Sequence, residues 1–198
     1  MDNKAKDTKE THFLCGKLLL AMPSMGDPRF HQAVILLCAH DENGAMGLVI
    51  NHAFPDLAFP ELLKQLKLTS DIKIDLDKLS LPVMYGGPVE TARGFLLHSS
   101  DFKQIDTVPI DEHFHITGTL DALREVALGN GPEDMIFILG YAGWGAGQLD
   151  HEMQQNAWLV VDPDPDLIFN AAPDKKWNMA IEKLGINPDF LSTEAGQA

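Results

Sequence analysis

The sequence predicts one folded domain of mixed α/β or α+β class, and three observations support this prediction. The chain has 198 residues, which is close to the length of a single domain. Its hydrophobic content of 45% and charged content of 22% are typical of globular proteins. Strand-like and helix-like segments are intermixed, with no internal repeat or low-complexity linker. We therefore expect a single domain over residues 12–198, after a disordered arm at residues 1–11 that carries mixed charge and no apolar periodicity.

Short apolar segments bounded by turn residues predict the strands. The clearest pattern is a β-hairpin, because apolar runs at residues 33–40 and 45–51 flank Asn43 and Gly44, a pair that favours a tight turn between strands. Residues 72–77 alternate between apolar and charged side chains, which fits either an exposed edge strand or an extended loop. Further strands are expected at residues 13–22, 94–98, 135–139 and 157–161.

Four helices are predicted where apolar residues recur with helical spacing. Pro60 occupies the favoured first turn of one helix, and Thr119 and Gly129 are expected to cap the two ends of another. A further helix is expected after residue 147, and a last one before Gly185. The side chains expected on the inner faces of these helices are Leu62, Leu63 and Leu66; Leu120, Leu123 and Ala127; Leu149 and Met153; and Trp177, Ile181 and Leu184.

The charge of the chain argues against direct binding to nucleic acid. There are 15 Lys and Arg residues against 29 Asp and Glu residues, which gives a formal net charge of −14 and a pI near 4.8. Residues 111–198 hold only 4 of the basic residues and 15 of the acidic ones. A protein that neutralises phosphates needs the opposite balance, so the charge disfavours direct binding to nucleic acid.

We expect a cytoplasmic protein that does not cross a membrane. The first twelve residues are polar and charged, unlike a secretory signal. The longest apolar run, residues 33–39, is far shorter than the roughly 20 residues that span a bilayer. Cys15 and Cys38 lie in apolar segments without a Cys-x-x-Cys motif, which favours buried, reduced thiols. In the alternative interpretation, the two cysteines lie on neighbouring strands and form a regulatory disulfide.

A glycine-rich segment at residues 138–150 follows the strand, turn and helix order of a phosphate-binding loop. A P-loop needs Lys and then Ser or Thr after its last glycine, whereas here Gln148 follows Gly147. The spacing of the glycines also differs from the Gly-x-Gly-x-x-Gly pattern of a dinucleotide site. No basic residue lies between residues 124 and 175, so an incoming phosphate would meet acidic side chains.

The same segment is where we predict a ligand. Tyr141 and Trp144 offer flat aromatic surfaces, and Gln148 and Glu152 add the polar groups that would hold a neutral, peptide-like or aromatic ligand. Gly143 belongs to the same predicted site. The structural alternative is a series of tight turns with close backbone packing. No cofactor is predicted for either interpretation.

Other polar patterns do not amount to a metal or catalytic motif. His113 and His115 alternate on one face of a predicted strand, but two ligands do not complete a metal site. Residues 162–166, Asp-Pro-Asp-Pro-Asp, lack the glycine and distal Glu of a calcium-binding hand and are typical of a turn into a helix. No Gly-x-Ser-x-Gly elbow is present, and Ser99 follows His98 with no partner visible in the sequence. We therefore predict no metal and assign no catalytic residue.

Five segments, in order along the chain, resemble the AlgH (YqgE) family of bacterial proteins. The resemblance covers residues 13–196 and implies a cytoplasmic protein whose antiparallel sheet is bent into a pseudo-barrel with helices around it. Most members are uncharacterised, part of the family is labelled as transcriptional regulators, and no catalytic residues carry over. The matching segments are residues 16–23, 27–30, 44–51, 86–89 and 140–149, the last followed by Asn156-Ala-Trp158. The motif positions that carry over are His40, Asn51, Gly86, Gly87, His98 and residues 140–152.

Three functions follow from these observations, in order of preference. The first is a non-enzymatic regulatory protein that acts through protein contacts or by sensing a small ligand, because the chain is acidic and lacks a nucleophile motif. The second is an enzyme whose site is assembled from distant segments, with His40, His98, Gln148 and Glu152 as candidates. Direct DNA binding comes last, since no predicted helix concentrates residues that read bases and phosphates.

Overall fold

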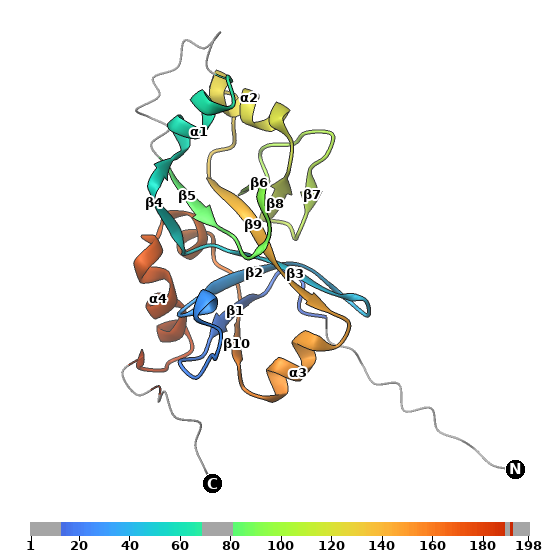
Figure 1. Ribbon diagram of the computed structural model, residues 1–198, viewed down its shortest axis with the longest axis vertical. Helices are drawn as coiled ribbons and strands as arrows, with labels where there is room; N and C mark the ends of the chain where they lie inside the picture. The colour runs from blue at the N-terminus through green and yellow to red at the C-terminus, as the bar shows by residue number, and fades with distance from the viewer. Residues whose placement is uncertain (1–12, 69–80, 189–190, 192–198) are drawn as a thin grey trace, which may run out of the picture.

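A curled, mostly antiparallel sheet forms the centre of the molecule (Figure 1). The computed structural model describes residues 13–68, 81–188 and 191. Along the sheet, the strands of these residues follow the order β10-β1-β2-β3-β9-β6-β8-β7, while β5 pairs with β4 and β9. The strands are β1 (Leu18–Ala21), β2 (Val34–Asp41), β3 (Gly44–Val49), β4 (Ala53–Ala58), β5 (Pro82–Tyr85), β6 (Val89–Ser99), β7 (Val108–Pro109), β8 (Phe114–Thr117), β9 (Met135–Gly145) and β10 (Trp158–Val161).

Helices surround this sheet (Figure 1). The α-helices are α1 (Phe59–Gln65), α2 (Leu120–Leu128), α3 (Gln148–Gln154) and α4 (Lys176–Lys183). Single turns of other helix types lie at η1 (Pro28–Phe30), η3 (Asp166–Asn170) and η4 (Pro173–Lys175). The long strand β9 runs through the middle, with α1 and α2 near one end and α3 near the other (Figure 1). This arrangement confirms the predicted α+β class with a bent antiparallel sheet; β5 and β9 are a parallel exception.

Strand β1 is buried on both faces, which explains its continuous apolar sequence. Leu18 and Leu20 pack on one face of the sheet, in a cluster that Trp177 and Ile181 of α4 also join. Leu19 packs on the opposite face with other apolar residues of the sheet and of α3. A third apolar cluster, under α1 and α2, includes Phe59, Leu63 and Leu123.

The local signals in the sequence located most elements correctly. The hairpin is confirmed, with Asp41 of β2 paired with Gly44 of β3. Thr119 accepts a hydrogen bond from the Ala122 N–H at the start of α2, and Gly129 ends that helix at φ +84°. The prediction of an inward-facing side chain is wrong at three positions, since Leu66, Leu120 and Leu184 are exposed. Each lies at the end of its helix, where the periodicity of the pattern says least about burial.

Two predictions in the sheet need correction. The first strand does not begin at residue 13, because the chain turns at Cys15 and Gly16, where φ is +81°. The predicted glycine-rich turn at residues 140–147 is mostly strand, since β9 continues to Gly145. Gly140, at φ +76°, lets β9 change direction, so that its first half pairs with β5 and β6 and its last residues pair with β3.

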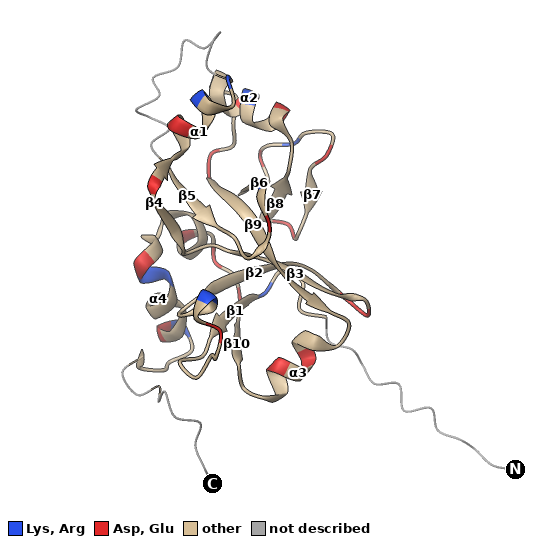
Figure 2. Ribbon diagram, in the orientation of Figure 1, with Lys and Arg blue, Asp and Glu red and all other residues tan. Residues whose placement is uncertain are grey.

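The cysteines and two predicted segments complete the comparison. Cys38 is buried as expected, but Cys15 is exposed because it lies in the turn before β1, and both thiols are free. The predicted arm at residues 1–11 and the alternating segment at residues 72–77 lie outside the described residues. Across the part of the chain that is described, no helix has both the length and the hydropathy of a membrane span. Helix α3 carries the acidic residues Asp150 and Glu152 but no Lys or Arg (Figure 2).

Candidate functional site

Glu152 joins three elements at one end of the sheet. Its Oε2 accepts the indole N–H of Trp144 on β9 at 2.9 Å and that of Trp158 on β10 at 2.7 Å. Its Oε1 accepts a hydrogen bond from Nε2 of Gln148 at 2.9 Å, one helical turn earlier on α3. The Oε1 of Gln148 in turn accepts the backbone N–H of Gly145 at 3.1 Å. These bonds fix α3 against the ends of two strands.

Beside Glu152 lies a cavity of about 380 Å³, large enough for a small organic ligand. Gly143, Trp144, Gln148 and Glu152, all predicted site residues, line it. The rings of Trp144 and Trp158 meet edge to face at 5.9 Å between centroids, and the Phe30 ring meets Trp158 in the same way at 5.8 Å. The remaining lining residues are Ser24, Met25, Gly26, Asp27, Arg29, Pro88, Gln155 and Ala157.

The single cationic side chain that lines this cavity, among the described residues, is already paired. Arg29 donates to both carboxylate oxygens of Asp27, at 2.6 to 3.1 Å. Hydrogen bonding to Arg29 lowers the pKa of Asp27 below its usual value. Among the described residues, Glu152 forms no salt bridge and the one cation of the lining is bound to Asp27, so the cavity disfavours an anionic ligand.

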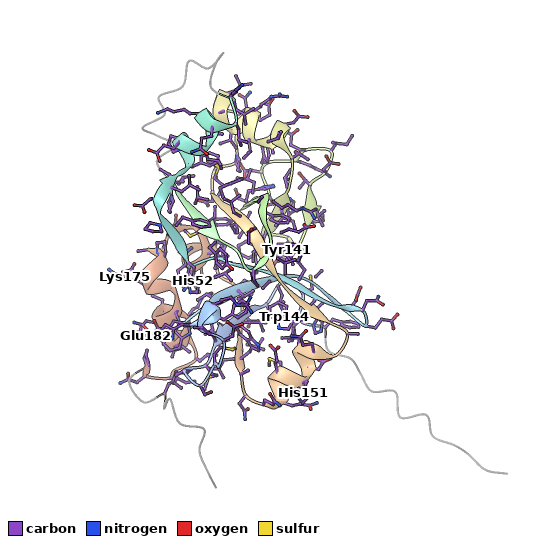
Figure 3. All side chains as sticks on the ribbon, in the orientation of Figure 1. His52, Tyr141, Trp144, His151, Lys175 and Glu182 are labelled. Atoms are coloured by element: carbon purple, nitrogen blue, oxygen red, sulfur yellow. The ribbon has the colours of Figure 1, made fainter. Side chains whose placement is uncertain are left out.

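Tyr141 does not share this cavity. It lies three residues before Trp144 on β9, and successive side chains of a strand point to opposite faces. Tyr141 packs edge to face with Phe95, at 6.2 Å between centroids, whereas Trp144 packs in the cluster on the other face. Figure 3 shows the two side chains at separate places along β9. The predicted pairing of these two rings around one ligand is therefore wrong.

Gly86 and Gly87 precede the lining residue Pro88 but are not themselves part of the lining, and their surroundings show a backbone role. A Cβ at Gly86 would stand 2.3 Å from the carbonyl oxygen of Gly140, and a Cβ at Gly87 would stand 2.2 Å from the carbonyl carbon of Tyr141. Both distances are too short for any side chain. These glycines permit the chain between β5 and β6 to pass directly against β9.

His40 and Asn51 form structural hydrogen bonds. Nδ1 of His40 accepts the Leu14 N–H at 3.1 Å, which holds the segment before β1. The Asn51 side chain accepts the Val34 N–H at 2.7 Å and donates to the Gln32 carbonyl at 2.8 Å. Because Gln32 has a positive φ of 50°, Asn51 stabilises an unfavourable backbone conformation at the start of β2.

His98 is fully buried on β6 and is the end of a hydrogen-bond chain. Its Nδ1 bonds the Ser99 carbonyl, which can only accept, so Nδ1 carries the proton in the neutral ring. Nε2 then accepts the Thr117 hydroxyl at 2.9 Å, and Thr117 accepts the Thr107 hydroxyl at 2.7 Å. Desolvation by burial lowers the pKa of His98, and the nearby His115 acts in the same direction.

The alternative enzyme site is not assembled by this geometry. Gln148 and Glu152 line one cavity, while His40 and His98 are outside its lining and bond to backbone groups and threonines elsewhere. Of the two histidines weighed as metal ligands, His115 lies on β8 opposite His98, and His113 precedes that strand and is exposed. In the described ranges, no group of three or more His, Cys, Asp or Glu side chains is arranged to hold a metal ion.

Sequence reasoning missed the residues that close the cavity from the far side. Trp158, Phe30, Arg29 and Asp27 all line it but lie far from residue 144 in the sequence. A signal was present, because residues 27–30 and 156–158 belong to the segments that resemble a known family. Their convergence depends on the curl of the sheet, because three strands separate β10 from β9 in the strand order, yet Trp158 and Trp144 bond the same carboxylate oxygen.

The fold and the site define a mixed α/β domain with a curled sheet and a polar, tryptophan-lined cavity at one end. The chain belongs to the AlgH-like family, whose model matches residues 18–189. A UPF0301 protein of Bradyrhizobium diazoefficiens is 50% identical over 190 residues, which cover 94% of this chain and 89% of that relative. A UPF0301 protein of Rhodospirillum rubrum is 47% identical over 190 residues, covering 96% and 97% of the two chains.

Solved structures agree with this assignment. The solution structure of the AlgH protein of Pseudomonas aeruginosa matches with a TM-score of 0.75 and 39% identity, over 100% of both chains. A crystal structure of a protein from Corynebacterium diphtheriae matches with a TM-score of 0.65 over 85% of each chain; at 20% identity this likeness concerns the fold alone.

Proposed function

We propose that this protein is a non-enzymatic regulator that senses a small neutral ligand in the cavity beside Glu152. The observation that carries the proposal is the pair of indole N–H groups, from Trp144 and Trp158, that converge on one carboxylate oxygen in the cavity wall. The bonds of Glu152 connect α3 to β9 and β10. A ligand that contacts Glu152 or Gln148 would change how α3 is held, and thereby the surface that a partner protein meets.

Hydrogen-bond accounting defines the chemistry of the ligand. A carboxylate offers about four acceptor positions, and three N–H groups occupy those of Glu152. The amide nitrogen of Gln148 has two N–H groups, one of which is used. One acceptor position and one donor position therefore remain side by side, which matches a neutral amide or carboxamide group. A flat apolar group of the ligand would then contact the tryptophan rings.

Charge supports a neutral ligand over an anionic one. Arg29 is engaged by Asp27, and Glu152 has no charged partner at this site among the described residues. The same reasoning extends to the regulatory output, because residues 111–198 are strongly acidic and disfavour DNA phosphates. We therefore propose that regulation operates through a protein partner. A regulatory role, as part of the family is labelled, would then involve no direct contact with DNA.

The experiment is a thermal-shift titration with two compounds, N-acetylphenylalanine amide and N-acetylphenylalanine. They differ only in the terminal group, which is a neutral carboxamide in the first and a carboxylate in the second. We expect the amide to raise the Tm by about 3 °C or more at ten times its Kd, and the carboxylate to raise it much less. The amide should be recovered unchanged after prolonged incubation, because the described lining residues include no Cys and no His that could activate Ser24. Hydrolysis of the amide, or equal shifts with both compounds, would overturn the proposal.

Two variants locate the binding. Gln148→Met keeps the length of the side chain, removes both the acceptor oxygen and the NH2 donor of the amide, and should abolish the shift. Asp150→Asn, on the same helix but outside the cavity lining, should leave the shift unchanged. Asp150 is exposed. If both variants lose the shift equally, the ligand does not bind at this cavity.

A further inference from the structure

A second cavity, of about 230 Å³, lies on the side of the molecule where α4 packs, apart from the tryptophan-lined one. Its walls are mainly apolar and include Met84 of β5, Met135 and Ile136 of β9, and Phe169 of η3. Pro82, Asn170 and Ala172 also line it, and all three are exposed, so they form a rim that solvent reaches. Lys176 is the one charged residue among the described residues of its lining.

Lys176 is an unusual residue for such a wall. Its side chain is 1% exposed, whereas lysines are almost never fully buried unless they are paired. Its ammonium donates to the carbonyl of Ile168, in the middle of η3. No carboxylate of the described residues forms an ion pair with it. Lys176 is also the first residue of α4, where the helix dipole disfavours a cation.

The surroundings of Lys176 favour a neutral amine. Desolvation by burial lowers the pKa of Lys176 to about 8. At pH 7.4 about a fifth of the side chain is then the free amine, against about 0.1% for a lysine with an ordinary pKa. A desolvated lysine in an apolar pocket is the arrangement that makes an amine nucleophilic toward carbonyl carbon. The neighbouring Lys175 is exposed and gives an internal comparison (Figure 3).

We propose that Lys176 and the cavity it lines form a binding site for a small apolar aldehyde or ketone, which the Nζ atom of Lys176 holds as an imine. The free amine attacks the carbonyl carbon, and a C–N bond forms as the carbonyl π-bond breaks to give a carbinolamine. Proton transfer from nitrogen to the hydroxyl group and loss of water then give the imine. The condensation involves no net oxidation or reduction and releases one molecule of water, so no further reactant is required. The hydrocarbon part of the ligand lies against Met84, Met135 and Phe169.

The test is imine trapping on the folded, full-length chain. The protein is incubated with butanal and sodium cyanoborohydride at pH 7.4, which converts an imine to a stable secondary amine, and the labelled lysines are identified by peptide mass mapping. We expect Lys176 to be labelled at least about tenfold faster than Lys175, because of its larger fraction of free amine. In urea, the two lysines should be labelled at equal rates.

The pH dependence of labelling provides the second measurement. The rate at Lys176 should reach half its maximum near pH 8, while the rate at Lys175 should still rise well above that pH. Lys176→Met keeps an apolar chain of similar length at the buried position and should lose the fast site, and Lys175→Met should retain it. Because the wild-type chain alone reports which lysine reacts, the result does not depend on how well a variant folds. Labelling of Lys176 at the rate of Lys175 or slower would overturn the proposal.

Discussion

Gly87 lies against Tyr141 so closely that a Cβ at position 87 would stand 2.2 Å from the Tyr141 carbonyl carbon. Gly87 also has a φ of +147°, a conformation that side chains disfavour. On the opposite side of the contact, Gly140 approaches the Gly87 carbonyl oxygen in the same way, at 2.6 Å from its would-be Cβ. The glycines therefore allow two backbones to meet where β9 changes direction.

Replacing Gly87 by Ala should destabilise the protein strongly. The added methyl group meets backbone atoms of β9, which cannot move without disturbing the pairing of β9 with its neighbours. We expect a loss of more than about 3 kcal/mol in the free energy of unfolding, measured by urea denaturation. Gly129→Ala is the matched control, because Gly129 also has a positive φ but no atom within 4 Å of its would-be Cβ. It should cost only about 1 kcal/mol, and similar losses for the two variants would contradict the contact.

Glu152→Gln should loosen the junction of α3 with the two strands. The amide keeps one acceptor oxygen but places an N–H group where Glu152 now accepts a hydrogen bond, so at least one of its three donors loses its partner. We expect a loss of about 1–3 kcal/mol in the free energy of unfolding and a change in tryptophan fluorescence, because Trp144 and Trp158 both bond this carboxylate. Glu182→Gln, an exposed site on α4 (Figure 3), should change stability by less than about 0.5 kcal/mol. Equal effects of both substitutions would show that the bonds to Glu152 contribute little.

The parts of the fold that depend on neighbouring residues could be predicted from the sequence. The hairpin turn at residues 41–44 and the caps at Thr119 and Gly129 are set by a few consecutive residues, and the structure has them where they were expected. The burial of the helix ends could not be predicted in the same way. Leu120, for instance, fits the helical stripe, but the helix begins at the rim of the core and the side chain remains exposed.

The site was predicted in part, and the errors have a physical cause. Gln148 and Glu152 lie one helical turn apart, so their neighbourhood follows from local geometry. Tyr141 and Trp144 were expected together because their segment was interpreted as a turn, whereas a strand sends them to opposite faces. Trp158 reaches Glu152 through the position of β10 at the edge of the sheet, and strand order is a property of the whole chain.

The two cysteines should react at very different rates. Cys15 is exposed and Cys38 is buried, and their thiols are free. Burial raises the pKa of both thiols, much more so at Cys38, so less of the reactive thiolate forms there. A disulfide reagent at pH 8 should therefore modify one thiol per chain, and the second only after denaturation. Cys15→Ser should remove the accessible thiol, and rapid reaction of two thiols in the folded wild type would contradict the burial of Cys38.

Stability should decrease as the pH falls through 6.5 because of His98. Desolvation lowers the folded-state pKa of His98 below its value of 6.5 in the unfolded chain, although the Ser99 carbonyl and Asp101 oppose this shift. The unfolded state then binds the proton more tightly, so the contribution of His98 is complete above pH 6.5 and is lost as the pH falls toward the folded-state pKa. Protonation of Nε2 also removes the acceptor for the Thr117 hydroxyl.

The measurement is urea denaturation at pH 7.5 and 5.5, above the range in which Asp and Glu titrate. His98→Gln should flatten the pH dependence, while His52→Gln should flatten it less, because His52 shifts in the same direction but is only half-buried. A wild-type stability that is the same at both pH values would show that the imidazolium is tolerated in this core.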